Sequence, residues 1–315
     1  MLAGYNHTSQ LHKGFSYRVL DDDGYLIPST IFEQVSKELA LNMYSTMVAL
    51  QTMDTIFYEA QRQGRLSFYL TSTGEEAINI ASAAALTLDD IVLPQYREPG
   101  VLLCGFTLKN LQINCSEIRL IMGKGRQMPI HMVPISLIIT VSSSHLPQAA
   151  GVASLKMDKK EACVVFILAM VAPVRTKSPV MKPCHFPCRN NGWAISTPGQ
   201  AYGIRSIRVD GNDVLQSTVL FAFARQMAIK EQKPILVEAM TYRVSHHSTS
   251  DDSTKYRCVK EIEQWRTEKS PITRFRKWIQ RNGWWADQNE LELRGNIRNR
   301  YWKQFKLQRR LRNLH

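Results

Sequence analysis

Apolar residues recur every three or four positions in the segment that follows residue 33. This spacing places them along one face of an α-helix, and they are Leu39, Met43, Met47, Leu50, Met53 and Phe57. Thr30 and Glu33 fit a capping box at the start of such a helix, and Gly64 supplies a stop. The pattern predicts a long amphipathic helix over residues 33–65 with its methionines in the core.

A second helix is expected to open at Thr73-Gly-Glu-Glu76, where the same capping logic applies. Its run of small residues at 81–86 allows close packing, so we expect this helix to lie against a sheet.

Short apolar runs indicate β-strands at 91–94, 135–141, 163–168, 206–209 and 235–242. Between the last two, Asn212 and Asp213 cap a predicted helix that runs to about Lys230, which gives the length of one parallel crossover unit. This alternation predicts an α/β fold with a parallel sheet flanked by helices. Polar residues 95–98 directly follow the first strand, at the position where open α/β sheets bind ligands.

The pattern changes after Asp251 to charged residues with tryptophans spaced through expected helices. We therefore predict three parts: an N-terminal arm at 1–28, the main α/β domain at 29–255, and a helical, basic C-terminal extension at 256–315. The longest apolar run, at 162–174, is too short to span a bilayer.

The formal net charge of +13 is concentrated near the C-terminus, because residues 274–315 hold twelve Lys and Arg but three acids. Such a tail could bind nucleic acid, with Tyr301 and Trp302 stacking on bases. The apolar residues Ile297, Tyr301 and Phe305 recur at steps of four, however, so an amphipathic helix with a solvated cationic face is the favoured interpretation. A zinc site at Cys184 and Cys188 is disfavoured, since no second ligand pair has suitable spacing.

Six strings in order along the chain carry a resemblance to a known family. They are RQGRLSFYLTSTGEEA at 62–77, QYREPGVL at 95–102, GKGRQMPIH at 123–131, CRNNGWAIST at 188–197, IRVDGNDV at 207–214 and EAMTYRVSHHSTSDDS at 238–253. Together they resemble the alpha subunits of the branched-chain 2-oxo acid dehydrogenases, also called 2-oxoisovalerate dehydrogenases.

The resemblance implies a thiamine-diphosphate-binding fold, with the cofactor held between an alpha and a beta subunit in an α2β2 assembly. Such enzymes decarboxylate branched 2-oxo acids and pass the acyl group to the lipoyl arm of an acyltransferase core. It also implies a regulatory kinase and the mitochondrial matrix as location, although no presequence is visible at the start of the chain.

The same resemblance assigns Tyr96, Arg97 and Arg189 to the diphosphate of the cofactor, and it implies that Gln95 and His247 also bind the cofactor. Arginine suits this task, because its planar fork meets phosphate oxygens with paired hydrogen bonds. Taken alone, the QYRE string would be interpreted as a surface arginine paired with Glu98.

By resemblance, Asn191 and the backbone carbonyl of Trp193, which replaces the usual Tyr, bind Mg²⁺. His247 matches an active-site histidine that binds near the reactive carbon of the cofactor and steers protons. Ser248 matches a regulatory phosphorylation site, where added negative charge would oppose an anionic substrate. Cys258 replaces a second phosphorylated serine. Without the family, the His246–His247 pair would be an ordinary solvated loop.

One half of the thiamine-diphosphate signature is missing. The signature places a Gly-acid-Gly string after a strand, and its acid binds Mg²⁺. Here no Gly occurs at 152–190 and no acid at 162–209. Weaker binding of both Mg²⁺ and thiamine diphosphate is expected, and bound K⁺ is not expected because the segment at 141–148 is shorter than in the family.

Two explanations fit this departure. The chain is either a catalytically impaired homologue, which keeps only subunit or kinase binding, or the product of a gene model with wrong exon boundaries around 132–187. The abrupt return of the resemblance at Cys188 favours the second.

Overall fold

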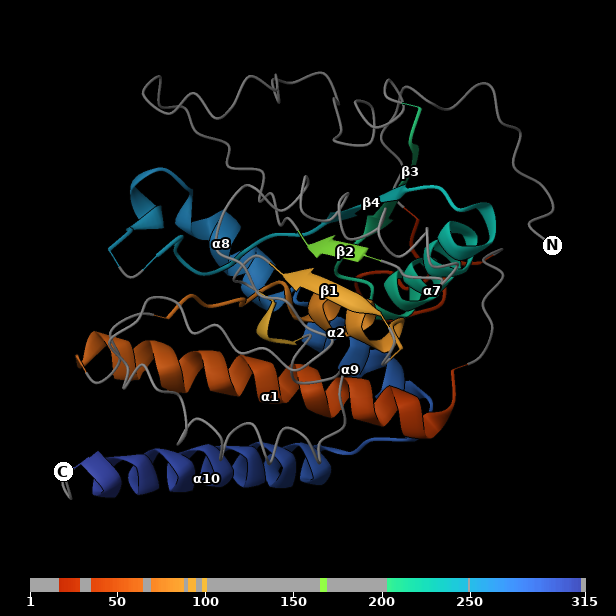
Figure 1. Ribbon diagram of the computed structural model, residues 1–315. Helices are drawn as coiled ribbons and strands as arrows, with labels where there is room; N and C mark the ends of the chain where they lie inside the picture. The colour runs from red at the N-terminus through yellow and green to blue at the C-terminus, as the bar shows by residue number, and fades with distance from the viewer. Residues whose placement is uncertain are drawn as a thin grey trace.

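The structure is a computed structural model in which helices and short parallel strands alternate along the chain (Figure 1). It describes residues 17–28, 35–64, 69–87, 90–94, 98–100, 165–168, 203–248 and 250–312. The predicted strand at 135–141 lies outside these ranges.

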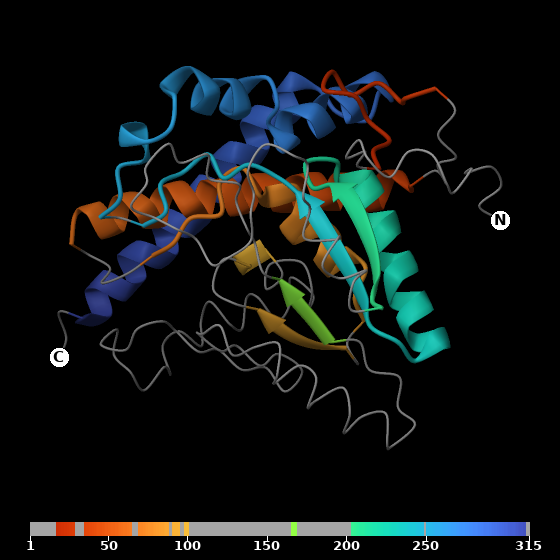
Figure 2. The ribbon, with the colours of Figure 1, turned by 90° about the horizontal axis from the view of Figure 1, so that it is seen from above.

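Two pairs of parallel strands confirm the predicted α/β class. Strand β1 (Ile91–Pro94) pairs with β2 (Val165–Leu168), with Pro94 opposite Leu168. Strand β3 (Arg205–Asp210) pairs with β4 (Ile235–Met240), and helix α7 (Val214–Glu231) connects them as predicted. In Figure 2, α7 lies along the β3–β4 pair, and the arrowheads of all four strands point toward the same side of the molecule. The four strands form two separate two-stranded sheets, and the carboxyl ends of both pairs point to the same side of the molecule.

Helix α1 (Lys37–Arg62) is the long amphipathic helix expected from the apolar periodicity. Its methionines are buried as predicted, and Gly64 follows its end with a φ of +69°. The predicted start was wrong, because Ser36 is the N-cap and its side chain accepts from the Leu39 amide. Leu39 is 40% exposed and does not belong to the buried face, since it lies in the first turn.

Helix α2 (Glu76–Ala84) begins two residues later than the predicted capping box implies, with Glu75 as its N-cap and no side-chain capping bond. The Thr73 hydroxyl donates to Asp54 of α1, while the Gly74 amide donates to the Glu76 carboxylate. Small side chains let α2 pack closely on α1, α7 and α9. Contact between α2 and a sheet stays a prediction.

Asp213 caps α7 as predicted, and it also fixes the N-terminal segment at 17–28. Its buried carboxylate accepts from the Gln216 amide at 3.1 Å and from the amides of Val19 and Leu20 at 2.6 and 2.7 Å. Burial raises the pKa of Asp213, and these three donors oppose that rise. One carboxylate thus joins a helix N-terminus to a segment far away in sequence.

The described chain after residue 252 is mostly helical. After a short 3₁₀ turn (Ser253–Lys255) come α8 (Val259–Thr267), α9 (Pro271–Arg281) and α10 (Asp287–Arg312). Helix α10 runs beside α1 (Figure 1). No helix in the described ranges is both long and apolar enough to cross a membrane.

Glu290 at the start of α10 fastens this helix to the core. It is 7% exposed and accepts from the Tyr44 hydroxyl of α1 at 2.6 Å and from the Trp285 indole at 3.1 Å. Ile297 and Tyr301 pack on the same core cluster, while Arg298 faces solvent. The apolar side of the basic helix is therefore already occupied, which weakens the nucleic-acid hypothesis.

Candidate functional site

Two of the strings predicted to form the cofactor site follow described strands: residues 95–97 follow β1, and the His247 loop follows β4 of the second strand pair. Strand β1 ends at Pro94, directly before residues 95–97, and β2 ends opposite it at Leu168, where the signature acid would normally follow. Parallel strands bind ligands at this carboxyl edge. The side chains of Gln95, Tyr96, Arg97, Arg189, Asn191 and Trp193 lie outside the described residues, so their roles stay predictions.

The residues after the QYR string are fixed against α2. Glu98 is 4% exposed, and the Gly100 amide donates to the Asn79 side chain at 3.2 Å. A Cβ on Gly100 would come within 2.5 Å of the Asn79 Cβ, so the two segments are in close contact. Both flanks of residues 95–97 are thus anchored.

His247 lies in the loop that follows β4, and its ring orientation is set by Arg243. The Arg243 Nη2 is 3.3 Å from the His247 Nδ1. A guanidinium group can only donate, so Nδ1 is the acceptor and the neutral ring carries its proton on Nε2. The backbone amide of His247 donates to Asp251 at 2.8 Å. The imidazole is therefore held in one tautomer on an exposed loop.

Tyr256 and Arg257 hold the two ends of this loop. The Tyr256 hydroxyl donates to Asp251 at 2.6 Å, and the Arg257 guanidinium donates to the carbonyls of Arg243 and Ser245 at 2.6 and 2.8 Å. Burial acts to raise the pKa of Asp251, but the hydrogen bonds from Tyr256 and His247 lower it below its ordinary value. An ionised Asp251 is thus the fixed acceptor at the centre of the loop.

Ser248 lies one residue beyond His247 and is half-buried. Its hydroxyl is 3.1 Å from that of Ser250, and its carbonyl accepts from the Asp251 amide at 3.2 Å. A phosphate at this position would stand beside the Asp251 carboxylate on a loop whose geometry depends on that carboxylate.

A tight turn at 71–74 supports the segment that leads into the loop. The Val244 amide donates to the Thr73 carbonyl at 3.0 Å. The Thr241 hydroxyl is 3.1 Å from the Gly74 carbonyl and 2.8 Å from the side-chain oxygen of Asn212, and these two acceptors share its one hydrogen. Gly74 has a φ of +96°, and a Cβ there would overlap the Tyr242 carbonyl. Glycine is therefore required where the two segments meet.

Two buried donors at the base of the loop fit an anionic ligand. The Arg243 Nε and the Ser245 hydroxyl are buried and have no hydrogen-bond partner among the described residues. Unpaired buried donors are costly unless a ligand or water satisfies them. Their cationic and hydroxyl character matches a phosphate or a carboxylate. For Mg²⁺, no cluster of three His, Cys, Asp or Glu side chains is found within the described ranges.

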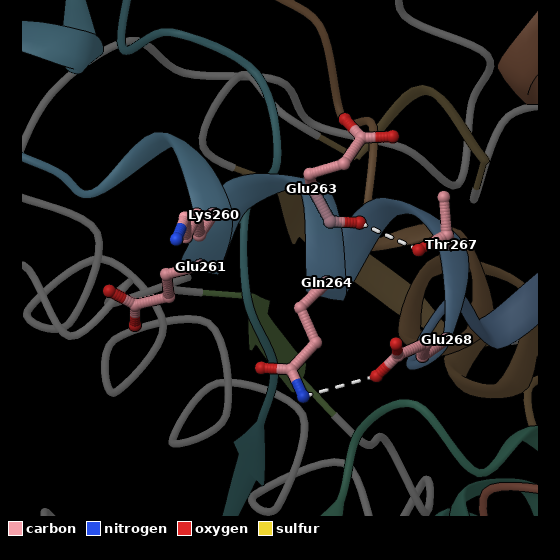
Figure 3. Close-up of a pocket in the computed structure, with 6 residues that line it drawn as sticks. All are labelled: Lys260, Glu261, Glu263, Gln264, Thr267 and Glu268. Atoms are coloured by element: carbon pink, nitrogen blue, oxygen red, sulfur yellow. Dashed lines mark hydrogen bonds between the residues drawn. The ribbon is translucent and has the colours of Figure 1, made fainter.

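A shallow hollow on the outer side of α8 is a poor candidate for the same ligand (Figure 3). Its walls include Glu261, Glu263 and Glu268, and the Gln264 amide donates to Glu268 across it at 3.1 Å. Three carboxylates would repel a diphosphate or an oxo acid. The His247 loop remains the candidate site.

Comparison with known proteins places the chain in a family. The dehydrogenase E1 component family matches residues 44–172 and 176–310, which is most of the chain. The chain therefore belongs to this family.

Named relatives agree with the resemblance drawn from the six strings. The chain is 56% identical over 309 residues to 2-oxoisovalerate dehydrogenase subunit alpha 1, mitochondrial, of Arabidopsis thaliana, a match that covers 90% of this chain and 66% of the relative. It is 41% identical to the Dictyostelium discoideum alpha subunit, covering 90% of this chain and 70% of the relative. The Homo sapiens alpha subunit is 40% identical, with 92% and 71% covered. The likeness to branched-chain alpha subunits is confirmed, and the chain spans 66% of the length of its Arabidopsis relative.

Sequence reasoning found His247 but missed the residues that hold it. Arg243 and Asp251 lie four positions to either side of the histidine, and no local pattern indicates that both turn back toward it. Asp54 was also missed, although the sequence contained a signal. It falls on the buried face of α1, one turn after Leu50, where a charge is unusual.

The buried carboxyl group of Glu76, beside the turn that supports the loop, should make the stability of the protein depend on pH. Burial raises its pKa from 4.5 to about 8, with the Gly74 amide acting in the opposite direction. The folded protein keeps this proton between those two pH values while the unfolded chain has lost it, so stability falls as pH rises through that window. In this window the free energy of unfolding of the wild type should fall by up to about 1.4 kcal/mol per pH unit, and we expect Glu76→Gln to abolish this decrease.

The measurement is urea unfolding of both proteins between pH 6 and pH 9. The free energy of unfolding of the Gln variant minus that of the wild type should increase with pH up to about pH 8 and then stay constant. A difference that is the same at every pH would contradict the buried, protonated state of Glu76.

Proposed function

We propose that the chain is the alpha subunit of a branched-chain 2-oxo acid dehydrogenase, which decarboxylates branched 2-oxo acids and transfers the acyl group to a lipoyl arm. The observation that carries this proposal is the His247 loop. In a member of the dehydrogenase E1 component family, a histidine with a fixed tautomer lies beyond the carboxyl end of β4.

His247 would act as the proton-steering residue. With Nδ1 occupied by Arg243, its Nε2–H is the group that can donate to an oxygen of the substrate. The Arg243 side chain also places positive charge beside the histidine, which favours an anionic oxo acid. The loop supplies both the donor and the electrostatic attraction.

The diphosphate end of thiamine diphosphate would be bound by Tyr96, Arg97 and Arg189, and Gln95 would also contact the cofactor. When bound, this cofactor supplies the carbanion chemistry on which decarboxylation depends. The anchored flanks of residues 95–97 support this assignment, because cationic side chains at a fixed strand end need little reordering to bind phosphate.

Mg²⁺ would be bound by the side chain of Asn191 and the carbonyl of Trp193. Both are the oxygen ligands that this ion prefers. The missing signature acid removes a carboxylate ligand, so we expect weak metal binding and we do not propose bound K⁺.

A beta subunit is the expected partner in an α2β2 assembly, as the word alpha in the relatives' names suggests. We also propose a lipoyl-bearing acyltransferase core and a kinase acting on Ser248 as partners. The relatives are named as mitochondrial, which supports the mitochondrial matrix as the location.

For the domain organisation, we propose an arm at 1–28, the cofactor-binding domain at 29–255 and a helical, basic extension at 256–315. The change to charged helices after Asp251 supports the last boundary. The extension would be a firmly docked one, because α9 and α10 pack on α1.

A catalytically impaired homologue is the second candidate, and the absent Gly-acid-Gly string favours it. Such a chain would keep the beta-subunit contacts or the kinase site without cofactor turnover. The fold and the His247 loop are compatible with both candidates, so cofactor binding must separate them.

We expect saturable binding of thiamine diphosphate with Mg²⁺ when the chain is assembled with its beta subunit, together with CO₂ release from 2-oxoisovalerate. Calorimetric titration and a decarboxylation assay measure the two. His247→Asn should keep the cofactor affinity but lower kcat by about a hundredfold or more, because only proton steering is lost. Absence of both binding and CO₂ release would favour the impaired homologue, and binding without CO₂ release would refute the catalytic proposal.

Ser248→Asp should lower activity by about tenfold or more, since it adds negative charge beside Asp251 and the anionic substrate. Ser248→Asn is the matched control, because it has nearly the same size without the charge. Steady-state assays of the assembled protein compare them. Equal inhibition by both substitutions would show that packing, and not charge, controls the loop.

A further inference from the structure

Asp54 is a buried carboxylate far from His247 in sequence, and no cation is bonded to it among the described residues. It lies on the buried face of α1 with no exposed surface. Burying a charge in this way is unfavourable unless hydrogen bonds stabilise it. The cost suggests a task beyond packing, because an apolar residue would fill the space at lower cost.

The task is visible in its hydrogen bonds, which all reach the segment before α2. The Asp54 carboxylate accepts from the Tyr69 hydroxyl and the Ser72 amide, both at 2.6 Å. It also accepts from the hydroxyls of Ser72 and Thr73, at 3.1 and 3.3 Å. Four donors from one short stretch converge on one side chain, so Asp54 determines the conformation of the turn at 71–74.

That turn is the support of the active-site loop. The Thr73 carbonyl accepts from the Val244 amide at 3.0 Å, and the adjacent Arg243 orients His247. Three successive hydrogen-bond contacts therefore link Asp54 to the imidazole: Asp54 to the turn, the turn to Val244, and Arg243 to His247. A displacement of the turn would be transmitted to the segment at 241–244, because the close contact at Gly74 leaves no space between them.

We propose that Asp54 is a positioning residue for His247, which acts by holding the turn at 71–74 on which the segment at 241–244 is docked. In this inference, the role of His247 rests on the proposed function. The link between Asp54 and the loop is independent of that function.

Proton binding at Asp54 would weaken this support within an accessible pH range. Burial raises its pKa to about 6, against the hydrogen bonds from Tyr69, Ser72 and Thr73. The titratable groups that interact with it are Tyr69 and Glu76. Behind them, Glu75 acts on Glu76, and Tyr301 of α10 acts on Tyr69. Ionised Asp54 is a full acceptor, whereas protonated Asp54 offers one oxygen as a donor to groups that are themselves donors.

The test compares Asp54→Asn with Glu290→Gln in the chain assembled with its beta subunit. Glu290 is the control, because it is also a buried carboxylate that accepts from a tyrosine hydroxyl, and it has no described contact with residues 241–248. Hydrogen exchange at the Val244 amide is measured first, since it needs no enzymatic activity. We expect about tenfold faster exchange in Asp54→Asn and no local change in Glu290→Gln.

The second readout is the pH dependence of kcat. The kcat of Asp54→Asn divided by the kcat of wild type should be near one at about pH 5, where wild-type Asp54 is also protonated. This ratio should fall to about one tenth at pH 8. A purely structural loss would give a ratio independent of pH. If Asp54→Asn does not fold, Ser72→Ala takes its place in the exchange experiment. This substitution removes only one donor to Asp54, so it should raise the exchange rate of the Val244 amide by a smaller factor.

Equal Val244 exchange in wild type, Asp54→Asn and Ser72→Ala would overturn the proposal. A wild-type assembly without decarboxylation would instead refute the proposed function, and the exchange measurement would still decide the link between Asp54 and the loop.

Discussion

The structure depends on the docking of the segment at 241–244 against the turn at 71–74. A backbone hydrogen bond from Val244 to Thr73 joins them, and the Thr241 hydroxyl lies 3.1 Å from the Gly74 carbonyl. Gly74 makes the contact possible, because any other residue would collide with the Tyr242 carbonyl. Through this contact the N-terminal helices set the position of a loop more than 150 residues later in the chain.

Buried charges make most of the other long-range connections. Asp213 fixes the N-terminal segment to α7, and Arg274 of α9, which is 3% exposed, bonds Asp22 and Asp210 at 2.6 and 2.7 Å. Arg225 of α7 bonds the fully buried Asp90 just before β1. Removing one partner of such a pair leaves an uncompensated charge, so each pair specifies which segments must meet.

Much of this fold could be predicted from the sequence, because its signals are local. The three- and four-residue spacing of apolar residues predicted α1, the capping residue Asp213 predicted α7, and the short apolar runs predicted four of the strands. The start of α1 was mispredicted, because Ser36 provides the capping oxygen for this helix. The cap of α2 was mispredicted, because Asp54 is the acceptor for the Thr73 hydroxyl.

The candidate site was predictable only in part. The family motifs identified His247, but its contacts with Arg243 and Asp251 depend on the three-dimensional path of the loop. The central claim is that this loop and the strand ends at Pro94 and Leu168 surround one cofactor site. A crystal structure of the chain with its beta subunit and thiamine diphosphate tests it most directly. We predict the diphosphate beside Arg97 and Arg189, with His247 facing the thiazolium ring. A cofactor bound elsewhere, or a His247 loop directed away from it, would contradict the account.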